Sequence, residues 1–241
     1  MTGMILSGHQ PCYLPGLGLF SKVMHSDAFM HVPHCQYVAG SWHSHNFIRN
    51  GRLTVPVHTT LGLSIQETKI DYTKTWQRKH LHAMEITYSK APYFQEFFPD
   101  ISWFLGRFYP NLAAMNMQFM DYMLDMLDCG RFDKSIYYGD NLDNSDAIAM
   151  IISMCKAVNC DTYLSNLGSM SYIGAKETTR MAEAGITHKW FSFSDPDYGQ
   201  GTIETDYQKK HPSGYSILDI LFHKGLEQSA KIIRGAGHVM G

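Results

Sequence analysis

The sequence predicts an α/β fold built on a mainly parallel sheet. Short apolar runs that are typical of strands alternate with helical stretches, most openly in the second half of the chain. The first 32 residues read as strand, loop, helix and strand, a succession that favours a parallel sheet. The 241 residues are 44% hydrophobic and 13% aromatic, which is enough to bury the core of one domain with an elaboration.

In the first half, the predicted strands are 4–7, 28–32, 52–57 and 65–71, and the predicted helices are 16–25, 76–89 and 111–127. Pro56 lies in the predicted strand at 52–57 and indicates a strand end or an edge strand, because proline cannot donate a hydrogen bond to a neighbouring strand. The segment 33–50 shows no clear periodicity, and 92–99 begins a further segment dense in aromatics. The strongest helix repeats apolar residues at intervals of three and four, namely Leu112, Met115, Phe119, Met123 and Met126. We interpret that stripe as core.

In the second half, the predicted strands are 135–138, 162–165 and 187–193, and the predicted helices are 145–158, 171–184 and 216–222. Ser145 and Ser216 are expected to cap the first and last of these helices. Gly185 is expected to end the middle one, because glycine tolerates the left-handed backbone found after many helices.

The charge balance excludes a basic field over the whole molecule, whereas a local basic groove stays open. Lys and Arg number 20 and Asp and Glu number 22, so the formal net charge is −2 and nucleic acid is not an expected partner. No apolar run reaches the roughly 18 residues that a membrane span needs, and the apolar start is too short for a secretory signal, so we expect a cytoplasmic protein without a membrane partner. The five cysteines form no CxxC motif and are expected to be reduced.

The stretch Leu6-Ser-Gly-His-Gln-Pro-Cys-Tyr-Leu-Pro15 follows the first predicted strand. Its prolines and glycine restrict or permit particular backbone geometries, which indicates a loop of fixed path. A loop between a strand and a helix is a natural ligand site, and His9 there can supply a proton or a charge. The alternative is that His9 only braces the turn. Cys12 is a further candidate, as a nucleophile activated by the helix.

A histidine-rich segment follows, with His31, His34, Cys35, His43 and His45. These residue types suit zinc or iron, although their spacing matches no closed zinc module. The same segment also fits a sugar-bearing or phosphate-bearing ligand, bound by stacking and hydrogen bonds from Trp42, Asn46, Arg49 and Arg52. Both interpretations stay open on the sequence.

Other candidates are spread along the chain. Lys79 and His80 follow Trp76 on a predicted helix, and Lys90 lies beyond Tyr88, which gives either a basic aromatic site or a helix face in water. Ser165-Asn-Leu-Gly168 follows a strand and is a possible second ligand loop, whereas 195–200 is expected to be a surface loop. Walker A, GxSxG, HExxH and GxGxxG motifs are absent.

An ordered set of motifs resembles the WbqC-like family. The set comprises His9-Gln-Pro-Cys-Tyr-Leu-Pro15, Gly18-Leu-Phe-Ser-Lys22, Ser26-Asp27, Gln36-Tyr37, Ser41-Trp42, Leu53-Thr-Val-Pro-Val57, Trp76 with Lys79-His80, Tyr88-Ser-Lys-Ala-Pro-Tyr-Phe94, Thr162-Tyr-Leu-Ser165, Tyr198 with Gln200, and Ser216-Ile-Leu-Asp-Ile-Leu-Phe222. Together they span nearly the whole chain. We therefore expect a single WbqC-like α/β domain over 1–241, with a helical elaboration at about 76–130.

The resemblance implies a transferase that moves an aminoacyl group, such as glycyl, or a related group in amino-sugar and surface-polysaccharide (O-antigen) biosynthesis. The implied partner is a small molecule, either a nucleotide sugar or an activated acyl donor, and the cofactor stays unknown. The expected catalytic residues are His9, Gln10, Lys79 and His80, and the expected ligand-binding residues are Tyr13, Gln36, Trp42, Asn46, Tyr88, Lys90, Ser165 and Gln200.

Several positions depart from the family pattern. Cys12 stands where asparagine is usual, Gly16 where tryptophan is usual, and the His34-Cys35 pair and the His43 to Phe47 run also differ. These changes leave room for a different substrate or a bound metal. The opening also resembles, more distantly, the nucleotidyltransferase superfamily with its HxGH loop, from which only a Rossmann-like three-layer fold carries over.

Three other functions remain open beside group transfer. One is non-catalytic binding of a nucleotide sugar or another small molecule. A second is a metal-dependent enzyme that uses His34, Cys35, His43 and His45, and a third is a nucleic-acid-modifying accessory enzyme.

Overall fold

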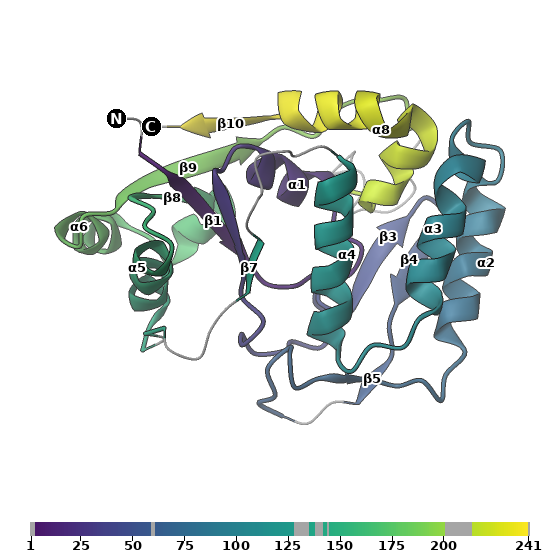
Figure 1. The fold of residues 1–241 in the computed structure, drawn as a ribbon, viewed down its shortest axis with the longest axis horizontal. Helices are drawn as coiled ribbons and strands as arrows, with labels where there is room; N and C mark the ends of the chain where they lie inside the picture. Colours follow the sequence, from purple (N-terminus) through teal and green to yellow (C-terminus); the bar gives the residue numbers. More distant parts are fainter. Residues whose placement is uncertain are drawn as a thin grey trace.

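The fold is built around a mostly parallel sheet that runs in the order β10-β9-β8-β1-β2-β7 (Figure 1). Its strands are β1 (Ile5–His9), β2 (Ala28–His31), β7 (Ser135–Tyr137), β8 (Thr162–Asn166), β9 (Thr187–Phe193) and β10 (Gly237–Met240). Neighbours are parallel except β10, which is antiparallel to β9. This computed structural model describes residues 3–58, 61–127, 135–137, 142–143, 145–200 and 214–240. The expected α/β class with a mainly parallel sheet is confirmed.

Helices cover both faces of this sheet. On one face, Leu6, Ala28 and Met30 pack with residues of α5 (Ala147–Ala157) and α6 (Ala175–Glu183). Phe29 alternates to the opposite face, where it packs with α1 (Leu17–Met24) and α8 (Ile217–Gly235). A short 3-10 helix, η1 (Leu167–Ser171), follows β8.

A second group of elements lies at the end of the molecule away from α6 (Figure 1). It contains the hairpin β3 (His45–Ile48) and β4 (Gly51–Thr54), the pair β5 (Val57–His58) and β6 (Lys69–Ile70), and the helices α2 (Trp76–Tyr88), α3 (Phe94–Gly106) and α4 (Leu112–Met126). Its apolar residues share one buried cluster with α1 and α8. The stripe on α4 is part of that cluster, which confirms that these methionines are core.

Most predicted elements are confirmed within a residue or two. The predicted strand at 187–193 coincides with β9, and the predicted helices at 16–25, 76–89 and 111–127 contain α1, α2 and α4. Asn111 caps α4 by accepting a hydrogen bond from the backbone of Ala114. Gly185 follows α6 with a φ of 79°, as expected of a helix-ending glycine.

Other predictions need correction. The segment 33–50 contains β3, and the predicted strand at 52–57 is divided between β4 and β5 around Pro56. Only Lys69–Ile70 of the predicted strand at 65–71 is extended. The first of these errors arises because Ser44, His45 and Asn46 are buried although they are polar, so β3 lacks an apolar pattern.

Helix ends account for the remaining corrections. Asp146, not Ser145, caps α5, and its carboxylate accepts from the backbones of Ile148 and Ala149 at 2.8 Å. The predicted helix at 171–184 begins only at Ala175. The predicted helix at 216–222 continues to Gly235, across Gly225 with its non-helical φ of 69°.

The strand order places an opening next to β1. The chain passes from β1 to β2 on one side, whereas β8 pairs with β1 on the other, so successive connections leave β1 in opposite directions. In open parallel sheets, a crevice forms at the carboxyl ends of the two strands where this reversal occurs. Here those ends are His9 of β1 and Asn166 of β8.

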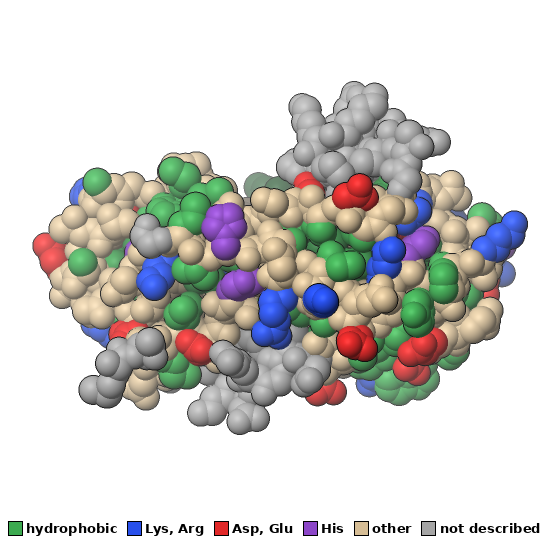
Figure 2. Space-filling view, turned by 90° about the horizontal axis from the view of Figure 1, so that it is seen from above, with side chains coloured by type: hydrophobic (Ala, Val, Ile, Leu, Met, Phe, Trp, Pro, Cys, Tyr) green, Lys and Arg blue, Asp and Glu red, His purple; other side chains and the backbone are tan. Residues whose placement is uncertain are grey.

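The surface is mixed in charge. The face shown in Figure 2 has acidic and basic side chains scattered among apolar and neutral groups, without a continuous basic stripe. Within the described residues, no helix is long and apolar enough to cross a membrane.

Candidate functional site

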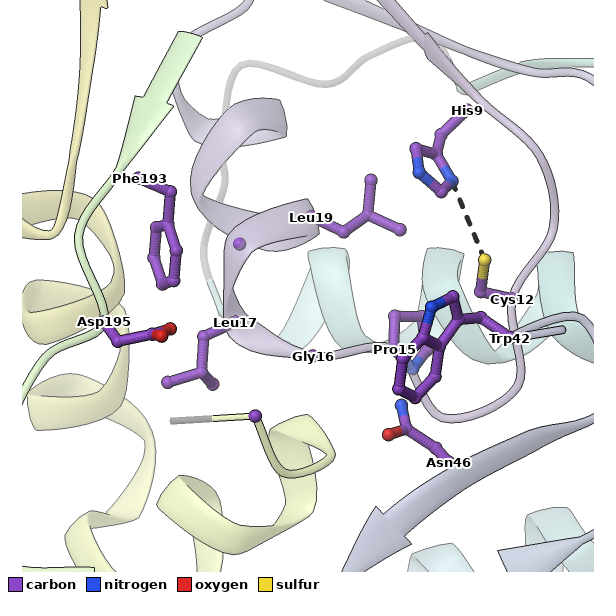
Figure 3. Close-up of a pocket in the computed structure, with 12 residues that line it drawn as sticks. His9, Cys12, Pro15, Gly16, Leu17, Leu19, Trp42, Asn46, Phe193 and Asp195 are labelled. Carbon is purple, nitrogen blue, oxygen red and sulfur yellow. Dashed lines mark hydrogen bonds between the residues drawn. The ribbon is translucent and has the colours of Figure 1, made fainter. Parts of the chain in front are cut away.

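Two cavities meet at the carboxyl edge of the sheet. One, the β8 cavity, has a volume of about 450 Å³ and is lined by residues of β1, the following loop, the 32–43 segment, β8 and η1. The other, the α1 cavity, has a volume of about 250 Å³ and is lined by the start of α1, with Phe193 and Asp195 opposite (Figure 3). His9, Cys12 and Trp42 line both cavities.

The loop that carries these residues, here called the site loop (residues 10–16), is held from several directions. The amide of Tyr13 donates to the carbonyl of Trp42 at 2.9 Å, and the amide of Ile217 donates to the carbonyl of Pro15 at 2.8 Å. Asn46 donates from Nδ2 to the carbonyl of Leu14 at 2.6 Å. Leu14 has a φ of 42°, a left-handed conformation that these contacts maintain.

Tyr13 also anchors the site loop to α2. Its side chain is buried, and its hydroxyl lies 2.8 Å from Nδ1 of His80. Burial lowers the pKa of His80 from 6.5 to about 4, so the ring is neutral near neutral pH. Neither cavity is lined by Tyr13 or His80. The structure therefore places this pair behind the loop, where it supports the site from the core.

His9 ends β1 and faces both cavities. Nδ1 lies 2.8 Å from the carbonyl oxygen of Gln10, and because a carbonyl only accepts, the ring proton is on Nδ1. In the neutral ring, Nε2 then has its lone pair available. Burial, with Lys22 nearby, lowers the pKa of His9 from 6.5 to about 3. His9 is thus a neutral hydrogen-bond acceptor in this site.

Gln10 and His43 form a second polar pair. The backbone amide of Val38 donates to Nδ1 of His43 at 3.4 Å, so in the neutral ring the proton is on Nε2. Nε2 then donates to Oε1 of Gln10 at 2.6 Å. Burial lowers the pKa of His43, which keeps the ring in this neutral form. Gln10 is therefore held in the wall of the β8 cavity next to His9.

Lys22 is a site residue that the sequence analysis did not select. It lies on α1 with only 2% of its surface exposed, lines the β8 cavity, and donates from Nζ to the carbonyl of Gly8 at 2.9 Å. Burial lowers its pKa from 10.5 to about 8. A signal was present in the sequence, because Lys22 is the one charged residue in the otherwise apolar stretch Leu17-Gly-Leu-Phe-Ser-Lys-Val-Met24.

Cys12 lies between His9 and the α1 cavity (Figure 3). Its sulfur is 3.8 Å from Nδ1 of His9 and donates to the carbonyl of Gln10 at 3.3 Å. Burial raises the pKa of the Cys12 thiol to about 12, and Lys22 only partly offsets that effect. The thiol is therefore protonated near neutral pH, the opposite of the activated thiolate that a nucleophile requires.

Several predicted ligand residues do line the cavities. Trp42 lies between the two cavities and packs against His45, with ring centroids 4.9 Å apart and ring planes tilted by 31°. Asn46 borders the α1 cavity, and Ser165 borders the β8 cavity, where its hydroxyl lies 2.9 Å from Nε2 of His188. The β8 cavity also includes Asn166, which follows Ser165 at the end of β8.

The structure places the other predicted residues elsewhere. Gln36 is exposed and bridges to Ser64, Lys90 is exposed beyond α2, and Lys79 lines a different concavity on α2. Tyr88 is buried, and its hydroxyl accepts from the backbone of Arg49. Gln200 is buried, and its side chain accepts from the backbone of Tyr198. None of these five side chains borders either cavity at the sheet edge.

The four potential metal ligands each interact with a side chain outside the set. His34 contacts the sulfur of Met150, His43 and Cys35 both interact with Gln10, and His45 packs against Trp42. Among the residues that the structure describes, no three His, Cys, Asp or Glu side chains form a group that could hold a metal ion. The arrangement of the described residues therefore does not support the metal-dependent hypothesis.

The geometry defines the chain as an α/β protein with a two-part cleft at the carboxyl edge of its sheet. The model of the WbqC-like protein family matches residues 10–231, and the chain belongs to that family. It is 27% identical over 232 residues to the uncharacterized protein Rv1507c of Mycobacterium tuberculosis, covering 90% of this chain and 93% of that protein. No solved structure matches the chain.

Proposed function

We propose that this protein is a cytoplasmic group-transfer enzyme that moves an aminoacyl (glycyl) or related group from an activated donor to an amino sugar, as in surface-polysaccharide (O-antigen) biosynthesis. The observation that carries the proposal is the division of the cleft into two cavities that share His9, Cys12 and Trp42. A transferase must hold a donor and an acceptor with their reacting atoms in contact, and His9 lies where two such ligands would meet.

The proposed step needs a proton acceptor at this point. When an amine attacks an acyl group, a bond forms between the amine nitrogen and the acyl carbon, the bond to the leaving group breaks, and the nitrogen loses a proton. Nε2 of neutral His9 is the group that would take this proton and pass it to the leaving group. Gln10, fixed by His43, would orient the reacting groups.

The proposal assigns different roles to the other expected catalytic residues. His80 becomes a positioning residue that acts through Tyr13, and Lys79 has no role at the cleft. We further propose one Rossmann-like domain over the whole chain, with α2, α3 and α4 as its helical elaboration. Support comes from the reversal of strand order at β1 and from the continuous apolar cluster that joins these helices to α1 and α8.

Product analysis tests this function. The protein is incubated with nucleotide-linked amino sugars and a panel of activated glycyl donors, and mass spectrometry detects the mass gain of acylation. His9→Asn keeps a donor for the Gln10 carbonyl but lacks Nε2, so turnover should fall by about 100-fold or more. His25→Asn is the matched control, because His25 lies outside both cavities. Equal turnover in wild type and His9→Asn would refute the role of His9.

A second candidate function has its own support. The pKa of about 3 makes His9 a weak base, which also fits a protein that binds a nucleotide sugar or another small molecule without consuming it. In that case, calorimetry would detect binding of one of the panel compounds, and mass spectrometry would recover it unchanged. Appearance of an acylated product would reject the binding-only function.

A further inference from the structure

Lys22 is a buried cation whose charge is not balanced within the described residues. Only 2% of its surface is exposed, and the hydrogen bond described for its ammonium group goes to the neutral carbonyl of Gly8. None of the ion pairs in the described part of the chain includes it. Buried ammonium groups are ordinarily paired, because their removal from water is costly.

The cavity that Lys22 lines also has no described acidic group. Its lining contains no Asp or Glu side chain, whereas it offers hydrogen-bond donors from Gln10, Tyr163 and Ser165. The α1 cavity differs in this respect, because Asp195 lies in its wall. The two halves of the cleft therefore differ in charge, and the β8 half is the one that an anionic ligand would complement.

An anion in the β8 cavity would supply the missing partner. A carboxylate or phosphate oxygen at hydrogen-bond distance from Nζ forms a charge-assisted hydrogen bond, which is stronger than one between neutral groups. The neighbouring Gln10 amide and Ser165 hydroxyl can hold its other oxygens. Because Lys22 is buried, its attraction to an anion in the cavity is screened less by water than that of an exposed lysine.

We propose that Lys22 binds an anionic oxygen group, either carboxylate or phosphate, of the ligand that occupies the β8 cavity. Anion binding itself is independent of catalysis; only the assignment of that anion to a transfer substrate rests on the proposed function. The two compartments would then divide recognition, with the charged part of one ligand held at Lys22 and the reacting atoms near His9.

Heteronuclear NMR titration of the full chain tests the proposal. The probes are sulfate, acetate and the neutral sulfate analogue dimethyl sulfone, at constant ionic strength. We expect saturable shifts around the β8 cavity with sulfate or acetate, and none with dimethyl sulfone. Which of the two anions binds more tightly distinguishes a phosphate-like ligand from a carboxylate ligand.

Lys22→Met should weaken this binding at least tenfold, whereas the control Lys156→Met, at an exposed position of α5, should leave it unchanged. Thermal unfolding verifies that both variants are folded. Because Met replaces a buried charge with an apolar group of similar length, Lys22→Met should remain folded. Binding that is equal in wild type and Lys22→Met, or no binding of either anion by wild type, overturns the proposal.

A pH series supplies a second readout that loss of folding would not imitate. The groups that interact electrostatically with Lys22 are His9 from β1 and Cys12 from the site loop, with pKa values of about 3 and about 12, so neither titrates between pH 7 and pH 9. Sulfate and acetate also keep their charge there. Deprotonation of Lys22 should therefore weaken anion binding by about tenfold over this range.

The outcomes for the two proposals are distinguishable. Anion binding without any acylated product would keep Lys22 as the anion-binding residue and refute the transferase. Acylated product at the same rate and with the same KM in wild type and Lys22→Met would keep the transferase and refute the role of Lys22.

Discussion

The hydroxyl of Tyr13 lies 2.8 Å from Nδ1 of His80, although 67 residues separate them in the chain. Tyr13→Phe removes one partner of this buried pair and leaves the imidazole nitrogen unsatisfied, so the free energy of unfolding should fall by about 1–3 kcal/mol. Urea denaturation measures the change. Tyr93→Phe is the control, because the hydroxyl of Tyr93 has no hydrogen bond among the described residues. Equal stability of the two variants would mean that the Tyr13 contact does not stabilise the site loop.

His80 should make the protein sensitive to mild acid. Its folded-state pKa of about 4 lies below the ordinary 6.5, so the unfolded chain takes up the proton at higher pH. The stability from neutral His80 is complete above pH 6.5 and is lost as pH falls from 6.5 towards 4. This one group should lower the free energy of unfolding by about 2 kcal/mol between pH 7 and pH 5.

Variants separate this effect from other titrations, including that of His9, whose pKa is also depressed. His80→Asn should reduce the slope of stability against pH, whereas His82→Asn, exposed on the same helix, should retain it. The slopes come from urea denaturation at a series of pH values. An unchanged slope in His80→Asn would contradict the assignment.

An ion pair between half-buried Arg49 and fully buried Asp219 joins the β3–β4 hairpin to the start of α8. Nε of Arg49 donates to Oδ1 of Asp219 at 2.7 Å, and the Tyr198 hydroxyl donates to Oδ2 at 2.7 Å. Arg49→Met leaves the fully buried carboxylate without its cation and should cost about 3–5 kcal/mol. Arg180→Met breaks an exposed pair with Asp146 and should cost far less, because water screens that pair. Urea denaturation measures the loss of stability in both variants. Similar losses in Arg49→Met and Arg180→Met would show that the pair at the hairpin stabilises the protein no more than the exposed pair.

Gly225 should resist substitution more strongly than Gly235. Its φ is 69°, and a Cβ there would lie 2.7 Å from a ring carbon of Tyr93. Gly225→Ala should therefore lower the free energy of unfolding by about 1–3 kcal/mol. Gly235 ends α8 with open space where a Cβ would lie, so Gly235→Ala should be neutral or slightly stabilising. Thermal melts of both variants check this, and a neutral Gly225→Ala would contradict the expected strain.

Local patterns predicted the sheet and most helices, but not elements that depend on distant partners. The strand at 187–193 has a readable strand composition, whereas β10 is extended because α8 returns the chain beside β9. The hairpin strand β3 was not predicted because its side chains are polar. In the folded chain, Asn46 donates a hydrogen bond to the Leu14 carbonyl and His45 packs against Trp42, so both residues are buried. The full length of α8 was not predicted, because the positive φ of Gly225 interrupts the helical periodicity.

The candidate site was also predictable only in part, because some of its residues depend on distant partners. The sequence indicated a ligand loop after the first strand, and His9, Gln10, Trp42, Asn46 and Ser165 do border the two cavities. It did not indicate that His80 supports the loop from behind or that Lys22 points its ammonium group to the Gly8 carbonyl. The mostly apolar neighbours of Lys22 indicate burial, but the contact of its ammonium group depends on elements that come together only in the fold.

The anchoring of the site loop has a consequence for how the protein folds. The contacts that hold the loop reach Asn46, His80 and Asn116, which lie 32, 67 and 105 residues further along the chain than their loop partners. Contacts between such distant segments close large loops of chain and tend to form slowly. During synthesis, the first strand and its loop emerge long before α8 exists to donate its hydrogen bond to Pro15. We therefore expect the cleft to be among the last features to form, so that a nascent or truncated chain has the residues of the site without their folded arrangement.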